Sequence, residues 1–263
     1  MKLPFFHVDA FTDTLFRGNP AGVCILDKWL PTAVMQQIAA ENFLPETAFF
    51  VPAGNDQFEL KWFTPDIEMD LCGHATLATA HTIFNHLNNP SDKISFQTKG
   101  GILTVSRDGD LLTLDFPSRM PSPAMLPEVI EKGIGIKPVE VWKARDYVLV
   151  CENQKQIKDC KPDRSVLDQI NLDPGGIIIT APGSEVDFVS RFFTTQSTIF
   201  EDPVTGSAHC SLIPLWSKKL GKKEMVALQL SERQGKLFCT NLQDRVLIAG
   251  KALTYLEGFI HVP

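Results

Sequence analysis

A short acidic segment precedes an apolar stretch in the second half of the chain. Residues 201–209 read EDPVTGSAH, and the following CSLIPLWSKKL predicts a helix that begins at the glycine turn. The first N–H groups of a helix lack acceptors within the helix and carry a partial positive charge. Glu201 and Asp202 therefore precede a helix start that attracts negative charge. We expect a binding site at this helix start, with Glu201 as a charged residue at its rim.

A segment in the first half has the same pattern. Residues 72–84 read CGHATLATAHTIF, follow the acidic stretch DIEMDL, and again predict a turn and then a helix. The N–H groups of Gly73 to Ala75 and of Gly206 to Ala208 would form two positive helix ends. Such ends suit an anionic group, so we expect a small substrate that bears a carboxylate.

The two halves also share the spacing that leads up to these turns. Pro52 lies eleven residues before Phe63, and Pro182 lies eleven residues before Phe193. Self-similarity at a fixed spacing is typical of internal repeats. The sequence therefore predicts two copies of one βαβ-rich unit, with equivalent helices over residues 73–86 and 206–219.

A proline-rich segment marks the boundary between the copies. PSRMPSPAMLPE, residues 117–128, holds four prolines that interrupt regular structure. We expect a first domain over residues 1–117, on which a last strand of about residues 252–263 packs, and a second domain over residues 118–251. A cleft between two such domains is a common place for a small-molecule site.

Composition excludes several classes of function. The 263 residues are 44% apolar, with a formal net charge of −6, so we expect no nucleic acid and no membrane as partner. No apolar run of signal-peptide or membrane-span length occurs, which favours a cytoplasmic protein. The six cysteines form no C-x-x-C pair and are expected to be small buried residues.

Four motifs carry a family resemblance. VDAFTDTLFRGNPAGV, LPETAFF, LCGHATLATAH and EDPVTGSAH occur in the order typical of the PhzF-like phenazine-biosynthesis isomerases, and the similarity spans nearly the whole chain. The resemblance implies the diaminopimelate-epimerase-like fold: an α/β (α+β) chain of two pseudo-equivalent domains, each a curled, mostly antiparallel sheet around a central helix. It also implies an active site between the domains, no cofactor and a homodimer.

The resemblance assigns the central role to Glu46 in LPETAFF. This glutamate would take a proton from one carbon and return it to another on the same face of the substrate. The neighbouring Ala48, Phe49 and Phe50 would place the carboxylate in partly apolar surroundings, which suit a general acid/base. Taken alone, a glutamate beside a proline would be interpreted as a helix cap or a surface residue.

His74 and Asp202 match the supporting acid/base and orienting groups of the family. The structural alternatives are a buried core histidine and a helix cap, respectively. Because His74 follows a predicted helix start, we expect the helix dipole to disfavour its imidazolium and to leave it neutral. Residues expected to bind the substrate are Gly73, Ala75, Gly206, Ser207 and Ala208, and Asn19 on the resemblance alone.

Cys72 directly precedes the first glycine turn. Epimerases of this fold use a cysteine before each glycine turn as the two bases that invert a stereocentre, whereas here the second position is Thr205. A threonine hydroxyl is far too weak an acid for that role, so two-base racemisation is disfavoured. Cys72 is kept as a candidate, because a helix start lowers the pKa of a thiol.

No metal or phosphate motif is evident in the sequence. His81 and His86 are five residues apart, which misses the i, i+4 spacing that pairs imidazoles on a helix, and no H-E-x-x-H occurs. Gly-rich phosphate loops are absent as well. We therefore expect no metal, and the resemblance implies no cofactor.

The favoured function is a cofactor-independent isomerase that moves a proton on a small carboxylated metabolite, with Glu46 as the shuttling base. Within enzymes, the alternative is an amino-acid or hydroxyacid epimerase that uses Glu46 and Cys72 as paired bases. An alternative of another class is a small-molecule binding protein without turnover.

Overall fold

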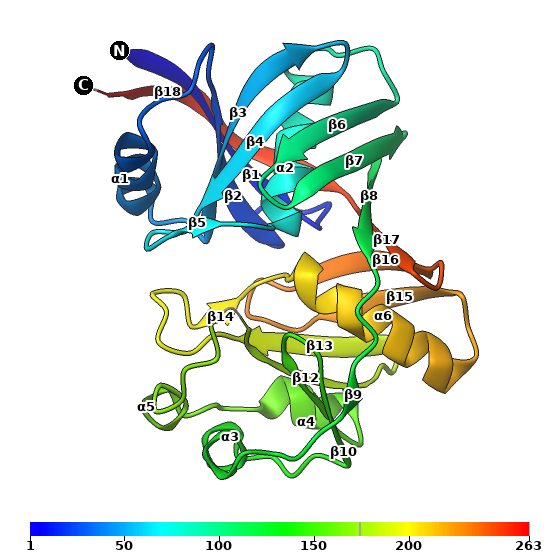
Figure 1. Cartoon of the computed structure of the whole chain (residues 1–263). Helices are drawn as coiled ribbons and strands as arrows, with labels where there is room; N and C mark the ends of the chain where they lie inside the picture. The colour runs from blue at the N-terminus through cyan, green and yellow to red at the C-terminus, as the bar shows by residue number, and fades with distance from the viewer. Residues whose placement is uncertain (174, 263) are drawn as a thin grey trace. The chain divides into compact units, whose positions relative to one another are not determined.

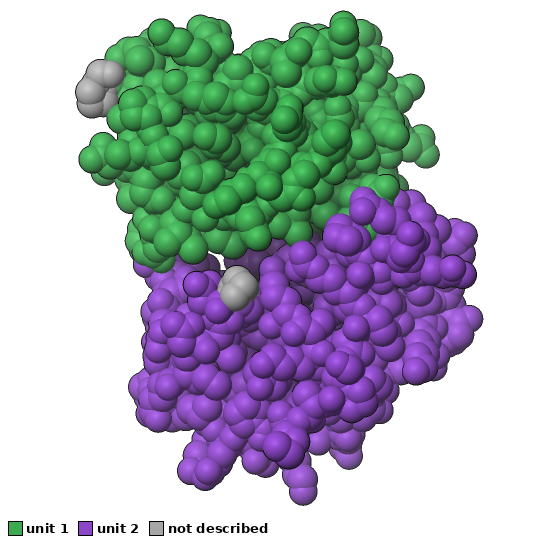
Figure 2. Space-filling view, in the orientation of Figure 1, with its two compact units in different colours: residues 1–116, 248–263 green, residues 117–247 purple. Residues whose placement is uncertain are grey.

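A computed structural model describes residues 1–173 and 175–262. Contacts divide the chain into two compact units, residues 1–116 with 248–263 and residues 117–247 (Figure 2). The last strand of the chain therefore belongs to the first unit.

The first unit is a sheet whose strands follow the order β18, β1, β2, β3, β4, β6, β7, β8 (Figure 1). Neighbours run antiparallel except for the parallel pairs β2–β3 and β4–β6. The short strand β5 pairs with β4. The elements are β1 (Lys2–Ala10), β2 (Asn19–Ile25), α1 (Thr32–Asn42), β3 (Glu46–Gly54), β4 (Gln57–Phe63), β5 (Glu68–Met69), α2 (Gly73–Asn85), β6 (Lys93–Thr98), β7 (Gly101–Asp108), β8 (Leu111–Pro117) and β18 (Ala252–His261).

Helix α2 is the centre of the first unit. It is buried at 11 of its 13 positions and contacts β1, β2, β3 and β18, so the sheet curls around it. Small residues let the sheet approach closely, and the hydroxyls of Thr76, Thr79 and Thr82 each donate to the carbonyl four residues earlier. These bonds explain how polar threonines are accommodated inside a buried helix.

The second unit repeats this arrangement. Strands β11, β12, β13 and β15 follow one another in its sheet, with β11–β12 and β13–β15 parallel and β12–β13 antiparallel. The strands are β9 (Ser122–Pro123), β10 (Glu140–Lys143), β11 (Tyr147–Val150), β12 (Ile177–Pro182), β13 (Phe188–Phe193), β14 (Glu201–Asp202), β15 (Glu224–Gln229), β16 (Gly235–Asn241) and β17 (Arg245–Gly250). The helices are α3 (Glu128–Ile134), α4 (Gln154–Asp159), α5 (Arg164–Leu167) and α6 (Gly206–Leu220).

Strand registers make the internal repeat explicit. Thr47 pairs with Phe63 in the β3–β4 hairpin, and Ile177 pairs with Phe193 in the β12–β13 hairpin. Each hairpin continues through a short paired strand, β5 or β14, into a buried helix that begins at a glycine, α2 or α6. The predicted repeat, its two helices and the predicted fold class are confirmed.

Helix α6 continues across a proline. Pro214 has no N–H group to donate to the carbonyl of Cys210, and the backbone N–H of Arg119 donates to that oxygen instead, at 2.9 Å. An external donor thus satisfies the acceptor that the proline leaves inside the helix. This bond explains why the helix predicted from CSLIPLWSKKL is not broken there.

Two further sequence-based expectations concern the chain as a whole. The six cysteines are free and buried, which confirms their interpretation as small core residues. Over residues 1–173 and 175–262, none of the helices combines the length and the apolar character needed to cross a membrane.

Candidate active site

Glu46 and His74 form an ion pair inside the first unit. Glu46 is the first residue of β3, and His74 is the second residue of α2. Glu46 Oε2 and His74 Nε2 lie 3.0 Å apart, and the two side chains are only 14% and 3% exposed. A predicted base and its predicted supporting group are therefore in contact, with little solvent around them.

Two more predicted residues lie at the other nitrogen of the His74 ring. Asn19 Nδ2 is 3.0 Å and Cys72 Sγ is 3.6 Å from His74 Nδ1. Asn19 begins β2, the parallel neighbour of β3. An amide can present either its NH₂ group or its oxygen, so Asn19 is able to serve a neutral or a doubly protonated imidazole. The parallel strands and the start of α2 thus bring four predicted residues together.

The charge of His74 differs from the prediction. Burial alone lowers the pKa of His74, but the negative charges of Cys72 and Glu46, together with hydrogen bonds to both, raise it well above its ordinary value. At neutral pH Cys72 is a protonated thiol, so the Glu46 carboxylate is the charge that holds the imidazolium. This direction runs against the expectation of a neutral His74, and the contact with the Glu46 carboxylate is its structural cause at neutral pH.

Cys72 is a thiol rather than a thiolate. Burial, and then the charge of Glu46, raise its pKa to about 11, although the positive charge of His74 and hydrogen bonds from His74 and the backbone of Ala75 oppose the shift. The lowering expected from the helix start is therefore outweighed by burial. A thiol in this state packs against the ion pair and is not a base at neutral pH.

Three of these side chains are also close enough for metal ligation. Glu46, Cys72 and His74 each offer a ligand atom, and these atoms lie within 4.8 Å of one another. A divalent ion would have to displace the protons of the thiol and the imidazolium and break the ion pair. The expectation of no metal stays a prediction.

The second unit holds Asp202 at the equivalent helix start. Thr205, the residue before α6, donates its hydroxyl to Asp202 Oδ2 at 2.6 Å. Gln229 accepts from the Thr205 backbone N–H at 2.8 Å and donates to the Asp202 carbonyl at 2.7 Å. Asp202 thus contacts the helix start through the Thr205 hydroxyl, and Gln229, which the sequence did not single out, fixes both residues.

Ser207 is the second residue of α6 and accepts a hydrogen bond from Arg145, a residue that sequence reasoning missed. Arg145 Nη2 donates to Ser207 Oγ at 2.9 Å. The same guanidinium binds both carboxylate oxygens of Asp146, the next residue in the chain. No pattern in the sequence singles out Arg145, because its partner Ser207 lies 62 residues further along the chain.

His209, the last residue of the EDPVTGSAH motif, is structural. Burial lowers its pKa to about 4, and a hydrogen bond to the Thr205 carbonyl opposes this shift only partly. The bond joins Nδ1 to the Thr205 oxygen at 2.8 Å. The neutral ring therefore donates to the carbonyl and packs within the unit.

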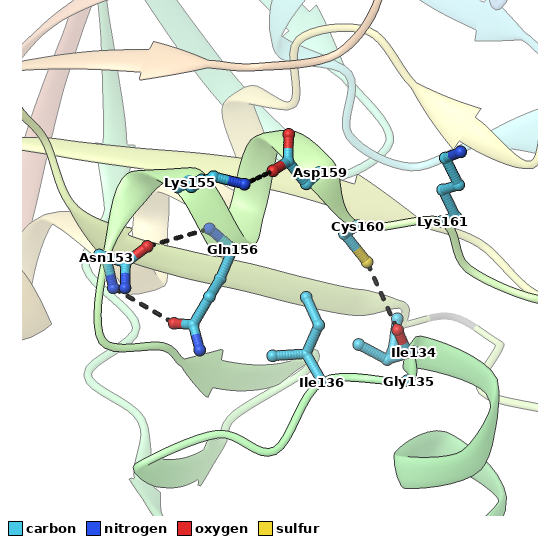
Figure 3. Close-up of a pocket in the computed structure, with 9 residues that line it drawn as sticks. All are labelled: Ile134, Gly135, Ile136, Asn153, Lys155, Gln156, Asp159, Cys160 and Lys161. Carbon is cyan, nitrogen blue, oxygen red and sulfur yellow. Dashed lines mark hydrogen bonds and ion pairs between the residues drawn. The ribbon is translucent and has the colours of Figure 1, made fainter.

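A separate hollow in the second unit holds none of the predicted site residues. It has a volume of about 490 Å³ and lies at the ends of α3 and α4 (Figure 3). The side chains of Asn153 and Gln156 each accept the backbone N–H of the other residue, and Lys155 forms an ion pair with Asp159. Cys160 donates its S–H to the carbonyl of Ile134. Nothing in this arrangement indicates a ligand.

The chain is similar to proteins of one family over almost its full length. Residues 8–258 match the family model described as phenazine biosynthesis-like protein. The chain belongs to this family. An uncharacterized isomerase of Pseudomonas aeruginosa is 45% identical over 262 residues, with 100% of both chains covered. The human phenazine biosynthesis-like domain-containing protein is 39% identical, with 98% of this chain and 99% of its own covered.

Solved structures agree with the family and the fold. A phenazine biosynthesis protein of the PhzF family from Enterococcus faecalis is 43% identical, covers 100% of both chains and gives a TM-score of 0.94. At 9% identity and a TM-score of 0.63, a hydroxyproline epimerase from Agrobacterium vitis shares the fold alone. The predicted PhzF-like family is confirmed, and the predicted enzyme class, an isomerase, agrees with the names of relatives.

Proposed function

We propose that this PhzF family member is a cofactor-independent isomerase that moves a proton on a small carboxylated metabolite, with Glu46 as its single acid/base. The observation that carries this function is the buried contact between Glu46 and His74 at 3.0 Å. A carboxylate held beside an imidazolium in a water-poor site is suited to take and return a proton.

The proposed isomerisation needs one carboxylate on the protein and one double bond in the substrate that changes position. Glu46 takes a proton from a carbon of the substrate, and the electron pair of the broken C–H bond enters the adjacent π system. The proton, now on the Glu46 carboxyl, forms a new C–H bond at a second carbon as the double bond moves. His74 stabilises the carboxylate before and after the transfer and orients it.

Asymmetry between the repeats favours a single base. The strand registers and helix starts place Gly176, Thr205 and Ser207 in the second unit where the first unit has Glu46, Cys72 and His74. None of these three counterparts is a general base at neutral pH. The two-base alternative also requires Cys72 as a thiolate, which its raised pKa of about 11 opposes.

The remaining predicted residues keep their roles as part of the same function. We assign Asp202 to orient the substrate, and the N–H groups at Gly73, Ala75, Gly206 and Ala208 to bind its carboxylate. A binding protein without turnover would have no need of a buried carboxylate–imidazolium pair, because that pair costs desolvation free energy.

The test is wash-in of solvent deuterium. The purified protein is incubated in D₂O with a panel of small carboxylates, and each is analysed by mass spectrometry for exchange at carbon. We expect exchange with at least one compound, and Glu46→Gln should slow it by about 10²- to 10⁴-fold, as for other lost general bases. Glu41→Gln, an exposed glutamate on α1, is the matched control.

Two outcomes would contradict this function. Tight carboxylate binding without exchange at any carbon would favour the binding protein. Unchanged exchange in Glu46→Gln would remove Glu46 from the chemistry.

A further inference from the structure

Arg145 is held rigidly in the turn between β10 and β11. Its Nε lies 3.0 and 3.2 Å from the two carboxylate oxygens of Asp146, and Nη2 lies 3.0 Å from Oδ2. Asp146 is only 1% exposed and also accepts the backbone N–H of Gly176 at 2.9 Å. A bidentate contact to a buried, anchored carboxylate fixes the plane and direction of the guanidinium.

The Arg145 guanidinium determines whether the Ser207 hydroxyl accepts or donates a hydrogen bond. Nη2 donates to Ser207 Oγ at 2.9 Å, and a guanidinium has no acceptor atom. The hydroxyl proton of Ser207 therefore cannot return to Arg145. Within residues 1–173 and 175–262, no hydrogen bond donated by this hydroxyl is found, although the side chain is half-buried. Its proton is left for an acceptor outside the protein.

We propose that Arg145 is a positioning residue that fixes Ser207 as a hydrogen-bond donor to the carboxylate of the substrate. The cation bound to Oγ polarises the O–H bond and makes it a stronger donor. Guanidinium and hydroxyl both present protons, so the site rejects cations and donor groups and favours an anionic acceptor. This role deepens the function proposed above and rests on it for the identity of the ligand.

Acetate is the probe. Its binding is measured by titrating it into the ¹⁵N-labelled full-length protein and following the amide resonances by NMR. In the wild type, acetate should shift the amide resonances of Gly206, Ser207 and Ala208, whereas acetamide should not. Ser207→Ala should weaken acetate binding about ten-fold, the usual cost of a hydrogen bond to a charged group. Arg145→Gln should weaken it by a similar factor, and Arg145→Lys should restore part of the loss.

The decisive readout is the double variant. If Arg145 acts through Ser207, Arg145→Gln should have no further effect once Ser207 is alanine, because the two changes remove the same donor. Additive losses would overturn the positioning role, since Arg145 would then bind acetate itself or act through the fold. Arg164→Gln, which removes a more exposed ion-paired arginine of α5, is the matched control and should leave the affinity unchanged.

Failure of this role and failure of the proposed function give different results. Acetate binding that depends on Ser207 and Arg145, without deuterium exchange on any carboxylate, would leave the role intact and overturn only the isomerase. No acetate shift at these amides in the wild type, or equal affinity in Arg145→Gln, would overturn the role. Unchanged β12 amide resonances in Arg145→Lys would show that the unit remains folded.

Discussion

At the scale of the residue, direct neighbours set the protonation of the two histidines that follow the glycine turns. His74 and His209 are both buried in the first turns of equivalent helices. His209 faces a carbonyl, and burial lowers its pKa to about 4, whereas the charges around His74 raise its pKa. Both residues lie at helix starts, but only His74 contacts a carboxylate, that of Glu46 on β3.

Direct titration of His74 checks this assignment. In ¹⁵N imidazole spectra, His74 should stay doubly protonated to a pH well above the ordinary 6.5. Glu46→Gln should lower the pKa of His74, because it removes a negative charge that opposes the lowering by burial. Since the pKa is raised in the folded state, the stability that this pair contributes is complete below about pH 6.5 and is lost as pH rises through the folded pKa. A neutral His74 at pH 7 in the wild type would contradict the ion pair.

At the scale of the element, the equivalent strands β3 and β12 differ at the position of the proposed base, Glu46. Glu46 opens β3, and its counterpart Gly176 directly precedes β12. A Cβ at Gly176 would lie 2.5 Å from the Phe192 ring and 2.7 Å from the carbonyl oxygen of Phe193. The second unit has therefore no room for a side chain at the position equivalent to Glu46.

Gly176→Ala tests that packing. The added methyl should lower the free energy of unfolding by about 1–3 kcal/mol, as overpacking of a core commonly does. Gly258→Ala on β18 is the control, because its nearest contact would be 3.9 Å away, at the Leu256 side chain. Urea unfolding at equilibrium measures both variants. Equal midpoints for Gly176→Ala and the wild type would show that β12 can accept a side chain there.

At the scale of the whole molecule, the spacing of prolines, phenylalanines and glycines was enough to predict the repeat, because each marks a turn or a hairpin end. The family motifs LPETAFF, LCGHATLATAH and EDPVTGSAH, rather than this spacing, predicted the roles of Glu46, His74 and Asp202. The sequence did not reveal Arg145, Asp146 or Gln229, since their importance comes from contacts between distant segments, such as Arg145 with Ser207. A local pattern cannot show such contacts.

The last strand should stabilise the first unit rather than the second. β18 pairs with β1 along Lys2 to Ala10, so deleting residues 252–263 would leave β1 as an edge. Hydrogen exchange should then accelerate at the amides of β1, while those of β12 and β13 keep their protection. Equal loss of protection in both units would contradict this dependence.

The relative rates of three variants test the single-base mechanism most directly. On any substrate that exchanges deuterium, Glu46→Gln should be slowest by about 10²- to 10⁴-fold, Asp202→Asn should be intermediate, and Cys72→Ser should be mild. The last is expected because Cys72 is a buried thiol with a pKa of about 11. A Cys72→Ser rate as low as that of Glu46→Gln would contradict the single base and establish Cys72 as the second one.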